Sequence, residues 1–151
     1  MLSPELTGWS VTKPIKKLLD LLVEEHRQLL ALTEQLSAIL LSESVRPDDR
    51  TRLRQLLAQF LELKTTHGQK EVAELFPALE QTLPEADYWQ IKMLEIQEES
   101  ILSEARHLYQ WMADNPSSAS FERLREDGAR MIRWMQEHVK FEEERLFSRL
   151  L

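Results

Sequence analysis

Two stretches of the chain have nearly the same pattern. Residues 67–79, HGQKEVAELFPAL, align with residues 138–150, HVKFEEERLFSRL, at an offset of 71, with His, Glu, Leu, Phe and Leu matching. Each begins with His-x-x-x-Glu, a spacing that puts both side chains on one face of a helix. The shared Leu-Phe pair, eight and nine residues after each His, makes a chance match rare. The chain is therefore predicted to consist of two related helical hairpins.

Outside these stretches, prolines mark the starts of long amphipathic segments. A proline in the first turn of a helix costs little, because its missing N–H would have no partner there. The prolines that stand near such starts are Pro14, Pro47, Pro84 and Pro116. We expect helices over residues 14–41, 48–80, 85–113 and 118–149. Short connections make neighbours antiparallel, so we predict an all-α fold, an up-down-up-down four-helix bundle over residues 14–151. Residues 1–13 would form a short N-terminal arm, with Trp9 placed to pin it to the bundle.

The composition narrows the class of protein. The 151 residues include 26 acidic and 19 basic side chains, a formal net charge of −7, and no cysteine. The lack of cysteine excludes a disulfide scaffold, a zinc finger, an iron–sulfur cluster and a cysteine nucleophile. The acidic balance argues against nucleic-acid binding. Because there is no apolar run of membrane-spanning length and no signal-peptide core, we expect a cytoplasmic protein with no membrane partner.

Three histidines and two glutamates fall on the inward faces of the expected helices. Steps of three and four residues place His26, His67, Glu71, His138 and Glu142 there. Reflecting each helix about the turn to its neighbour sets all five in one layer of the bundle. Burying these groups is costly without compensation, and a metal ion compensates directly. Imidazole and carboxylate ligands together suit iron or manganese.

At this point the residues resemble a known family, the hemerythrin-like group of HHE cation-binding four-helix bundles. The resemblance covers about residues 14–150. It rests on Glu25-His26, on His67-x-x-x-Glu71 followed by Glu-Leu-Phe-Pro at 74–77, and on His138-x-x-x-Glu142 followed by Leu146-Phe147. It implies a non-haem di-iron centre with Glu71 and Glu142 as bridging ligands. The three histidines would be terminal ligands.

The third expected helix departs from the family pattern. The family pattern there is similar to a Glu-His pair, whereas this chain has Glu98-Glu99-Ser100, and stepping along the helix puts Ser100 in the ligand slot. The inward face predicted for this helix comprises Trp89, Met93, Ile96, Ser100, Ser103, His107 and Trp111. Since a hydroxyl is a poor iron ligand, three alternatives stay open. One iron has an open or water-filled position, Glu99 or Glu95 substitutes as a ligand, or the second iron is weakly held or missing. His107 lies about 10 Å farther along the helix, outside the layer.

The resemblance implies binding or sensing of a diatomic gas, O₂ or nitric oxide, or the handling of iron. The cofactor would be two iron ions, with one iron or another divalent metal as alternatives. No residue is assigned a catalytic role. A di-iron oxidase, or a factor that repairs iron–sulfur clusters, is the enzymatic alternative. A metal-poor bundle acting as an interaction module is the third. The oligomeric state stays open, with a homo-oligomer among the alternatives.

Overall fold

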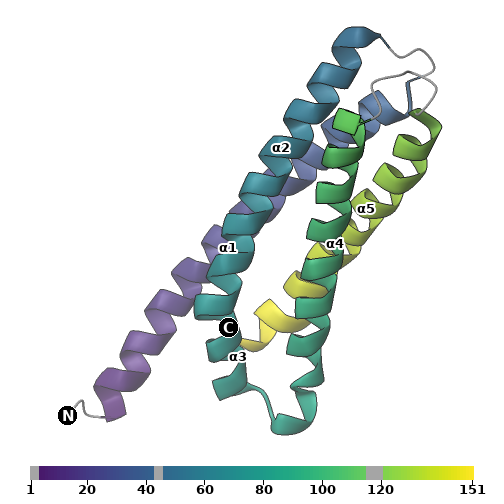
Figure 1. Cartoon of the computed structure of the whole chain (residues 1–151). Helices are drawn as coiled ribbons and strands as arrows, with labels where there is room; N and C mark the ends of the chain where they lie inside the picture. Colours follow the sequence, from purple (N-terminus) through teal and green to yellow (C-terminus); the bar gives the residue numbers. More distant parts are fainter. Residues whose placement is uncertain (1–3, 43–45, 115–120) are drawn as a thin grey trace.

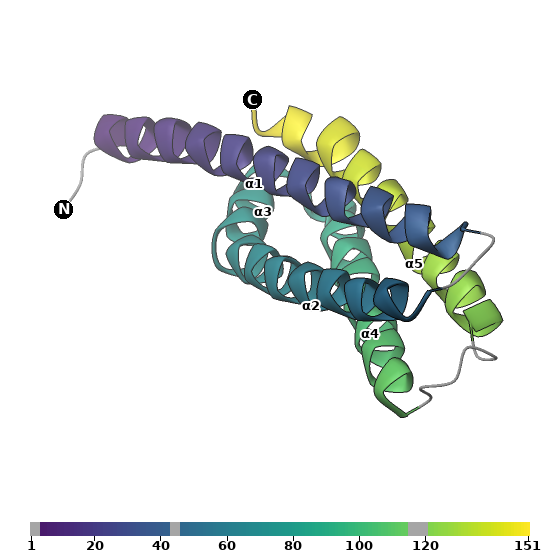
Figure 2. The same ribbon diagram turned by 90° about the horizontal axis from the view of Figure 1, so that it is seen from above.

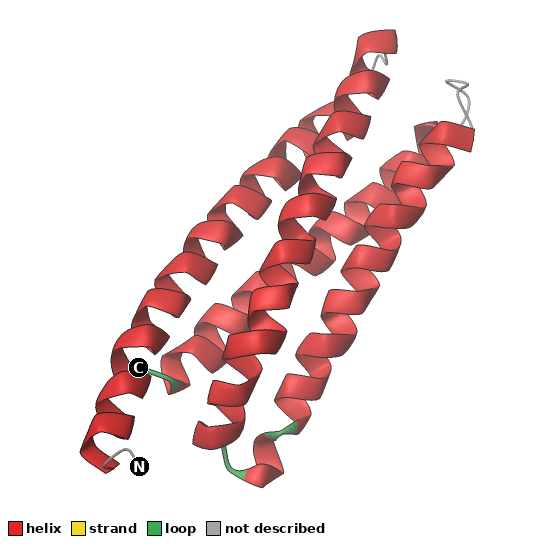
Figure 3. Ribbon diagram, turned by 60° about the vertical axis from the view of Figure 1, so that its left-hand side comes forward, coloured by secondary structure: helices red, strands yellow, loops and turns green. Residues whose placement is uncertain are grey.

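The computed structural model describes residues 4–42, 46–114 and 121–151, and over these ranges helices account for nearly the whole chain (Figures 1 and 3). Four long helical segments run antiparallel, which confirms the predicted four-helix bundle. The first is α1 (Pro4–Leu40). The second consists of α2 (Pro47–Lys70), a π-helical turn η1 (Glu71–Leu75) and α3 (Phe76–Thr82). A short 3₁₀ turn, η2 (Glu85–Asp87), leads to the third, α4 (Trp89–Asp114). The fourth consists of α5 (Phe121–Phe141), the π-helical turn η4 (Glu142–Leu146) and η5 (Phe147–Arg149).

The helices form a closed ring in which each contacts two others. Helix α1 packs against α2 and α5, and α4 packs against the same two helices (Figure 2). None of the helices in the described ranges is both long enough and apolar enough to cross a membrane. The two hairpins predicted from the repeat, α1 with α2 and α4 with α5, thus lie face to face.

Helix α1 starts ten residues earlier than predicted. Residues 4–13 were expected in a separate arm, but their backbone continues α1 to Pro4 (Figure 2). Pro4 suits a first helical turn as well as Pro14 does, so the proline pattern alone did not fix the start. The side chain of Trp9 lies outside the described part of the structure, and its packing on the bundle stays a prediction.

Two hydrophobic clusters fill the bundle, one toward each end. One extends from Leu29 to Leu40 on α1 and includes Phe60 of α2. The other includes Leu22 of α1 and Leu75 of η1. Between the two clusters every helical segment contributes buried or half-buried polar side chains. The two apolar clusters therefore shield a polar layer at mid-height from water.

The inward face predicted for the third long helix, α4, is wrong. Trp89, Met93 and Ile96 are 53%, 42% and 60% exposed, and Ser100 and His107 also face solvent. The buried residues of α4 are Ile91, Leu94, Ile101, Leu102, Ala105, Leu108 and Met112. Two apolar stripes compete on this helix. The one that packs inward carries the longer run of aliphatic residues, and a charged residue, Glu98, interrupts it.

Candidate metal centre

The structure brings the five principal predicted residues together at mid-height. His26 comes from α1, His67 from α2, Glu71 from η1, His138 from α5 and Glu142 from η4, and none is more than 1% exposed. The Nε2 atom of His26 lies 2.8 Å from Glu142 Oε1, and that of His138 lies 3.3 Å from Glu142 Oε2. The Nε2 atom of His67 lies 3.1 Å from Glu71 Oε1 and 3.8 Å from Glu142 Oε1. Glu142 is thus the carboxylate on which the histidines of three helices converge.

These inward atoms lie close to one another as ion pairs but form no hydrogen bond of acceptable geometry. Within the described residues, the buried side-chain atoms without a partner are Nε2 of His26, His67 and His138, both carboxylate oxygens of Glu71 and Glu142, and Oε1 of Glu98. A buried polar atom left without a partner costs about 1–3 kcal/mol, so this concentration is expensive in the metal-free protein. Every one of these atoms can donate an electron pair to a metal. Nitrogen and carboxylate oxygen without thiolate form a donor set that fits iron.

Two groups of three side chains can each hold a metal ion. Within each group, one potential ligand atom per residue lies within 4.8 Å of the others. His26, His67 and Glu142 form the first group, which we call site 1. Glu71, Glu98 and His138 form the second, site 2. The centre therefore has donors for a pair of ions, drawn from all four helical segments.

A second layer of contacts orients the three imidazoles. The Nδ1 atom of His26 lies 2.6 Å from Glu143 Oε2, and that of His67 lies 2.9 Å from Glu25 Oε1. The Nδ1 atom of His138 donates to Gln97 Oε1 at 2.8 Å. An acceptor on Nδ1 leaves the Nε2 lone pair free for a metal, which is the usual arrangement around ligating histidines. We did not predict Glu25 or Gln97 in these roles, because both contacts cross between helices.

Each Glu of the repeated motif begins a π-helical turn. In η1 the N–H of Phe76 donates to the carbonyl of Glu71, five residues back, and in η4 Phe147 does the same to Glu142. Such wide turns occur frequently at functional sites. The aromatic ring of Phe147 stacks on His26, with ring centroids 5.7 Å apart. Phe147 of the repeat is therefore part of the wall of the centre, and the Leu-Phe pairs of both motifs belong to the apolar cluster beside it.

Helix α4, the third long segment, contributes Glu98 to the layer rather than Ser100. Glu98 is 15% exposed, and its Oε2 lies 3.3 Å from Nε2 of His138. Glu99 and Glu95, the alternatives predicted from the sequence, are exposed, because α4 is rotated so that Glu98 faces the centre. Gly68 faces Glu98: a Cβ atom at Gly68 would lie 2.6 Å from Glu98 Oε1. The spacing of Glu98 from Leu94 and Ile101, four and three residues away, is the signal that sequence reasoning could have used.

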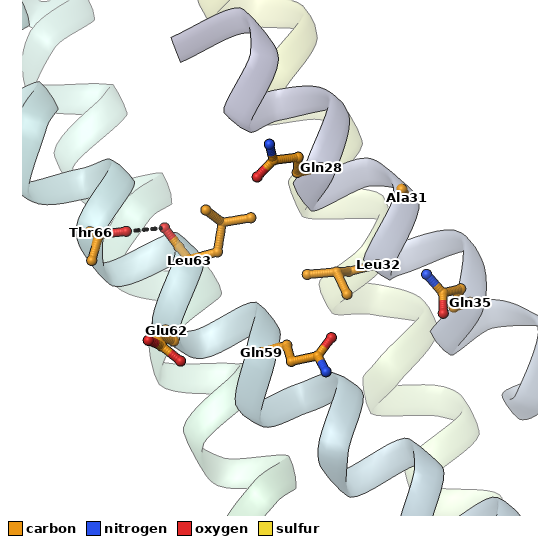
Figure 4. A pocket seen from close by; sticks show the side chains of 8 residues that line it. All are labelled: Gln28, Ala31, Leu32, Gln35, Gln59, Glu62, Leu63 and Thr66. Atoms are coloured by element: carbon orange, nitrogen blue, oxygen red, sulfur yellow. Dashed lines mark hydrogen bonds between the residues drawn. The ribbon is translucent and has the colours of Figure 1, made fainter. Parts of the chain in front are cut away.

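A buried lysine also lies in the layer. Lys64 of α2 is 0% exposed, and its Nζ donates to Glu98 Oε2 at 2.5 Å. Leu63 is half-buried and lines an outer groove of about 500 Å³ between α1 and α2 (Figure 4). In that groove Leu63 and Leu32 point toward each other from opposite walls.

The charges of the centre perturb one another strongly. Burial would lower the pKa of His67, but contacts with Glu142 and Glu71 outweigh it and raise the pKa to about 10. The pKa of His138 rises to about 9, since the charge of Glu142 outweighs burial. Burial and the charge of Glu142 raise the pKa of Glu71 to about 8. Burial also acts to raise the pKa of Glu142, yet Glu71 and the histidines hold it well below its usual range. Protons on these groups thus partly replace a cation when no metal is bound.

Comparison with known proteins agrees with this geometry. A family model described as the hemerythrin HHE cation binding domain matches residues 17–150. Comparison with curated proteins and with solved structures gave no significant match. The family match covers the repeat, the inward histidines and glutamates, and all four helical segments. The chain therefore belongs to the hemerythrin HHE cation-binding domain family.

Proposed function

We propose that the buried layer holds non-haem iron and that the protein binds or senses a diatomic gas, O₂ or nitric oxide. The observation that carries the proposal is the set of buried nitrogen and oxygen atoms without hydrogen-bond partners, which face one another at mid-height. Iron held by such donors can bind a small ligand reversibly where a coordination position is open. Family membership adds cation binding to the argument.

The ligands divide between the two sites. His26, His67 and Glu142 would hold one ion, and Glu71, Glu98 and His138 the other. The acceptors on the Nδ1 atoms, Glu143, Glu25 and Gln97, keep each imidazole turned with Nε2 inward. Fixing the tautomer in this way typically increases metal affinity by one to two orders of magnitude.

The surroundings of the layer favour a very small external ligand. The five side chains predicted as ligands are at most 1% exposed, and apolar clusters cover the layer on both sides. A larger organic substrate cannot reach these atoms without a rearrangement of the helices. A hollow of about 240 Å³ lined by Gln97, Ser100, Trp134 and Glu137 lies on the outer side of Gln97. Because Gln97 also contacts His138, this hollow is the approach to the centre that we favour for a gas molecule.

The same buried atoms argue against a metal-poor interaction module. A bundle that no longer used a metal would gain stability from apolar side chains in this layer. The chain instead retains two His-x-x-x-Glu pairs with their outer hydrogen-bond partners.

Metal content after anaerobic purification, followed by absorption spectra on exposure to air or nitric oxide, tests the proposal. We expect bound iron and a spectral change that appears with the gas and reverses when the gas is removed. Glu71→Gln and Glu142→Gln should lose iron. Glu144→Gln, an exposed position in the same turn as Glu142, is the matched control and should keep iron. Iron absent from the wild-type protein, or equal iron in all variants, would refute the proposal.

A further inference from the structure

Lys64 places an amino group inside the metal layer. It precedes His67 and Gly68 by about one turn of α2, is fully buried, and donates to Glu98 Oε2. The same oxygen lies 3.3 Å from Nε2 of His138. Lysine is almost never fully buried unless it is paired with an acid, so the pair with Glu98 is what keeps the ammonium there.

The pair makes its direct contact with one metal site, although the charge of Lys64 also acts to lower the pKa of His67 in the other. Site 2 (Glu71, Glu98, His138) includes the carboxylate that Lys64 engages. Among the described residues, no ligand residue of site 1 (His26, His67, Glu142) has an ion pair with a lysine. Lys70 lies one contact farther out, where it pairs with Glu25, the carboxylate beside Nδ1 of His67. Glu98 is also confined on its other side, where its Oε1 packs against the bare backbone of Gly68. A metal entering site 2 must therefore compete with an ammonium for Glu98.

The charge balance of the layer leads to the same conclusion. Three inward carboxylates, Glu71, Glu98 and Glu142, face the ammonium of Lys64, whereas the ammonium of Lys70 pairs with the outer carboxylate Glu25. With neutral imidazoles, one divalent cation neutralises this inner set. A second divalent cation would add two positive charges beside a buried ammonium, where low polarity strengthens the repulsion.

We propose that Lys64 makes the two metal sites unequal. Site 1 fills first, and site 2 binds its ion more weakly because Lys64 must release Glu98 and tolerate a second cation. This inference rests on the proposed metal-binding function. It concerns the order and affinity of loading, which do not depend on whether a gas binds afterwards.

Anaerobic titration of the metal-free full-length chain with Co²⁺, followed by visible absorption and by the number of ions retained per chain, tests the proposal. For the wild-type protein we expect two binding phases, the second at least about tenfold weaker than the first, as one adjacent buried charge demands. Lys64→Met removes the charge at nearly constant length and should tighten the second phase at least about tenfold. Lys64→Arg keeps the charge and should keep the two phases apart. Lys140→Met, the same change at an exposed site on α5, should match the wild type.

Several results would overturn the proposal. These are two equal phases in the wild-type protein, a second phase in Lys64→Met as weak as in the wild type, or no Co²⁺ bound at all. Circular dichroism checks that each variant folds. If Lys64→Met does not fold, Lys64→Gln provides the neutral comparison. Two unequal Co²⁺ phases that Lys64→Met brings together, in a protein that shows no response to O₂ or nitric oxide, would keep this inference and reject the gas-binding function.

Discussion

Gly68→Ala tests how Glu98 of α4 is accommodated in the metal centre. In an ordinary helix interior this substitution stabilises a protein by about 1 kcal/mol, because alanine has the higher helix propensity. Here the new Cβ would lie 2.6 Å from Glu98 Oε1, whereas ordinary contact begins at 3.4 Å. The carboxylate must therefore move, or the two helices must separate slightly.

The expected magnitude follows from what Glu98 holds. Moving the carboxylate weakens its hydrogen bond to Lys64, which is 2.5 Å long and involves a fully buried ammonium. A hydrogen bond to a charged group contributes about 1.5–3 kcal/mol. Since this loss exceeds the gain in propensity, Gly68→Ala should destabilise the metal-free protein by about 0.5–2 kcal/mol. In a Lys64→Met/Glu98→Ala background the carboxylate that the new Cβ would meet is absent. The same change should then stabilise the protein by up to about 1 kcal/mol.

Urea unfolding of the four proteins in the presence of a chelator measures this reversal of sign. Gly128→Ala is the matched control, because a Cβ there would lie 2.6 Å from the Cδ1 atom of Leu40, in the apolar cluster. Its effect should be the same in both backgrounds. If Gly68→Ala also changes stability equally in both backgrounds, then Gly68 does not accommodate Glu98 and the reasoning fails.

Three further predictions concern the loss of a ligand, the pH dependence of the metal-free layer and the packing of α4. Glu71→Leu removes a ligand residue of site 2, so iron should raise the unfolding midpoint less than it does in the wild-type protein. Thermal unfolding with and without iron measures this difference, and an iron-induced rise equal to that of the wild type would contradict it. The folded-state pKa values of His67 and His138, about 10 and 9, exceed the usual 6.5, so their stabilisation is full below pH 6.5 and is lost as the pH rises toward 9–10. The pKa of Glu71 is raised to about 8, so ionisation of this carboxyl lowers the stability of the fold further as the pH rises above 4.5. The unfolding midpoint of the metal-free protein should therefore fall between pH 6 and pH 9. A midpoint that does not fall would argue against these shifts. Ile101→Ala should cost about 2–5 kcal/mol in urea unfolding, whereas Ile96→Ala should cost close to none, and similar costs would mean that α4 presents another face to the core.

The repeat made much of the centre predictable from the sequence. His67 with Glu71 and His138 with Glu142 share one spacing, and helical periodicity alone turns each pair to one side. Reflection about the turns then placed His26 level with them, because short connections in a bundle fix the heights of neighbouring helices. The structure places all five side chains in one buried layer.

The third helix could not be predicted in the same way, because it carries two competing stripes. Trp89, Met93 and Ile96 are large and apolar, and they drew the predicted face toward Ser100, away from Glu98. Lys64 was missed for a related reason. A charged side chain in an apolar stripe is normally assigned to the surface, and only the position of its partner on another helix shows that burial is tolerable. Interhelical partners depend on the rotation of each helix, which a single sequence does not record.

The burial of this layer has a consequence for how the protein holds its metal. Without a metal ion, burial and the repulsion between carboxylates raise the pKa of Glu71. The raised pKa values of His67 and His138 keep protons on both imidazoles. Any metal must displace these protons, so its affinity depends on pH, and its binding energy also stabilises the fold. Lys64 limits this requirement, because its ammonium lies against Glu98 on one side of the layer. A centre with a built-in cation on one side needs only one exogenous ion to approach neutrality, which leaves the second site as the position that can most easily remain open.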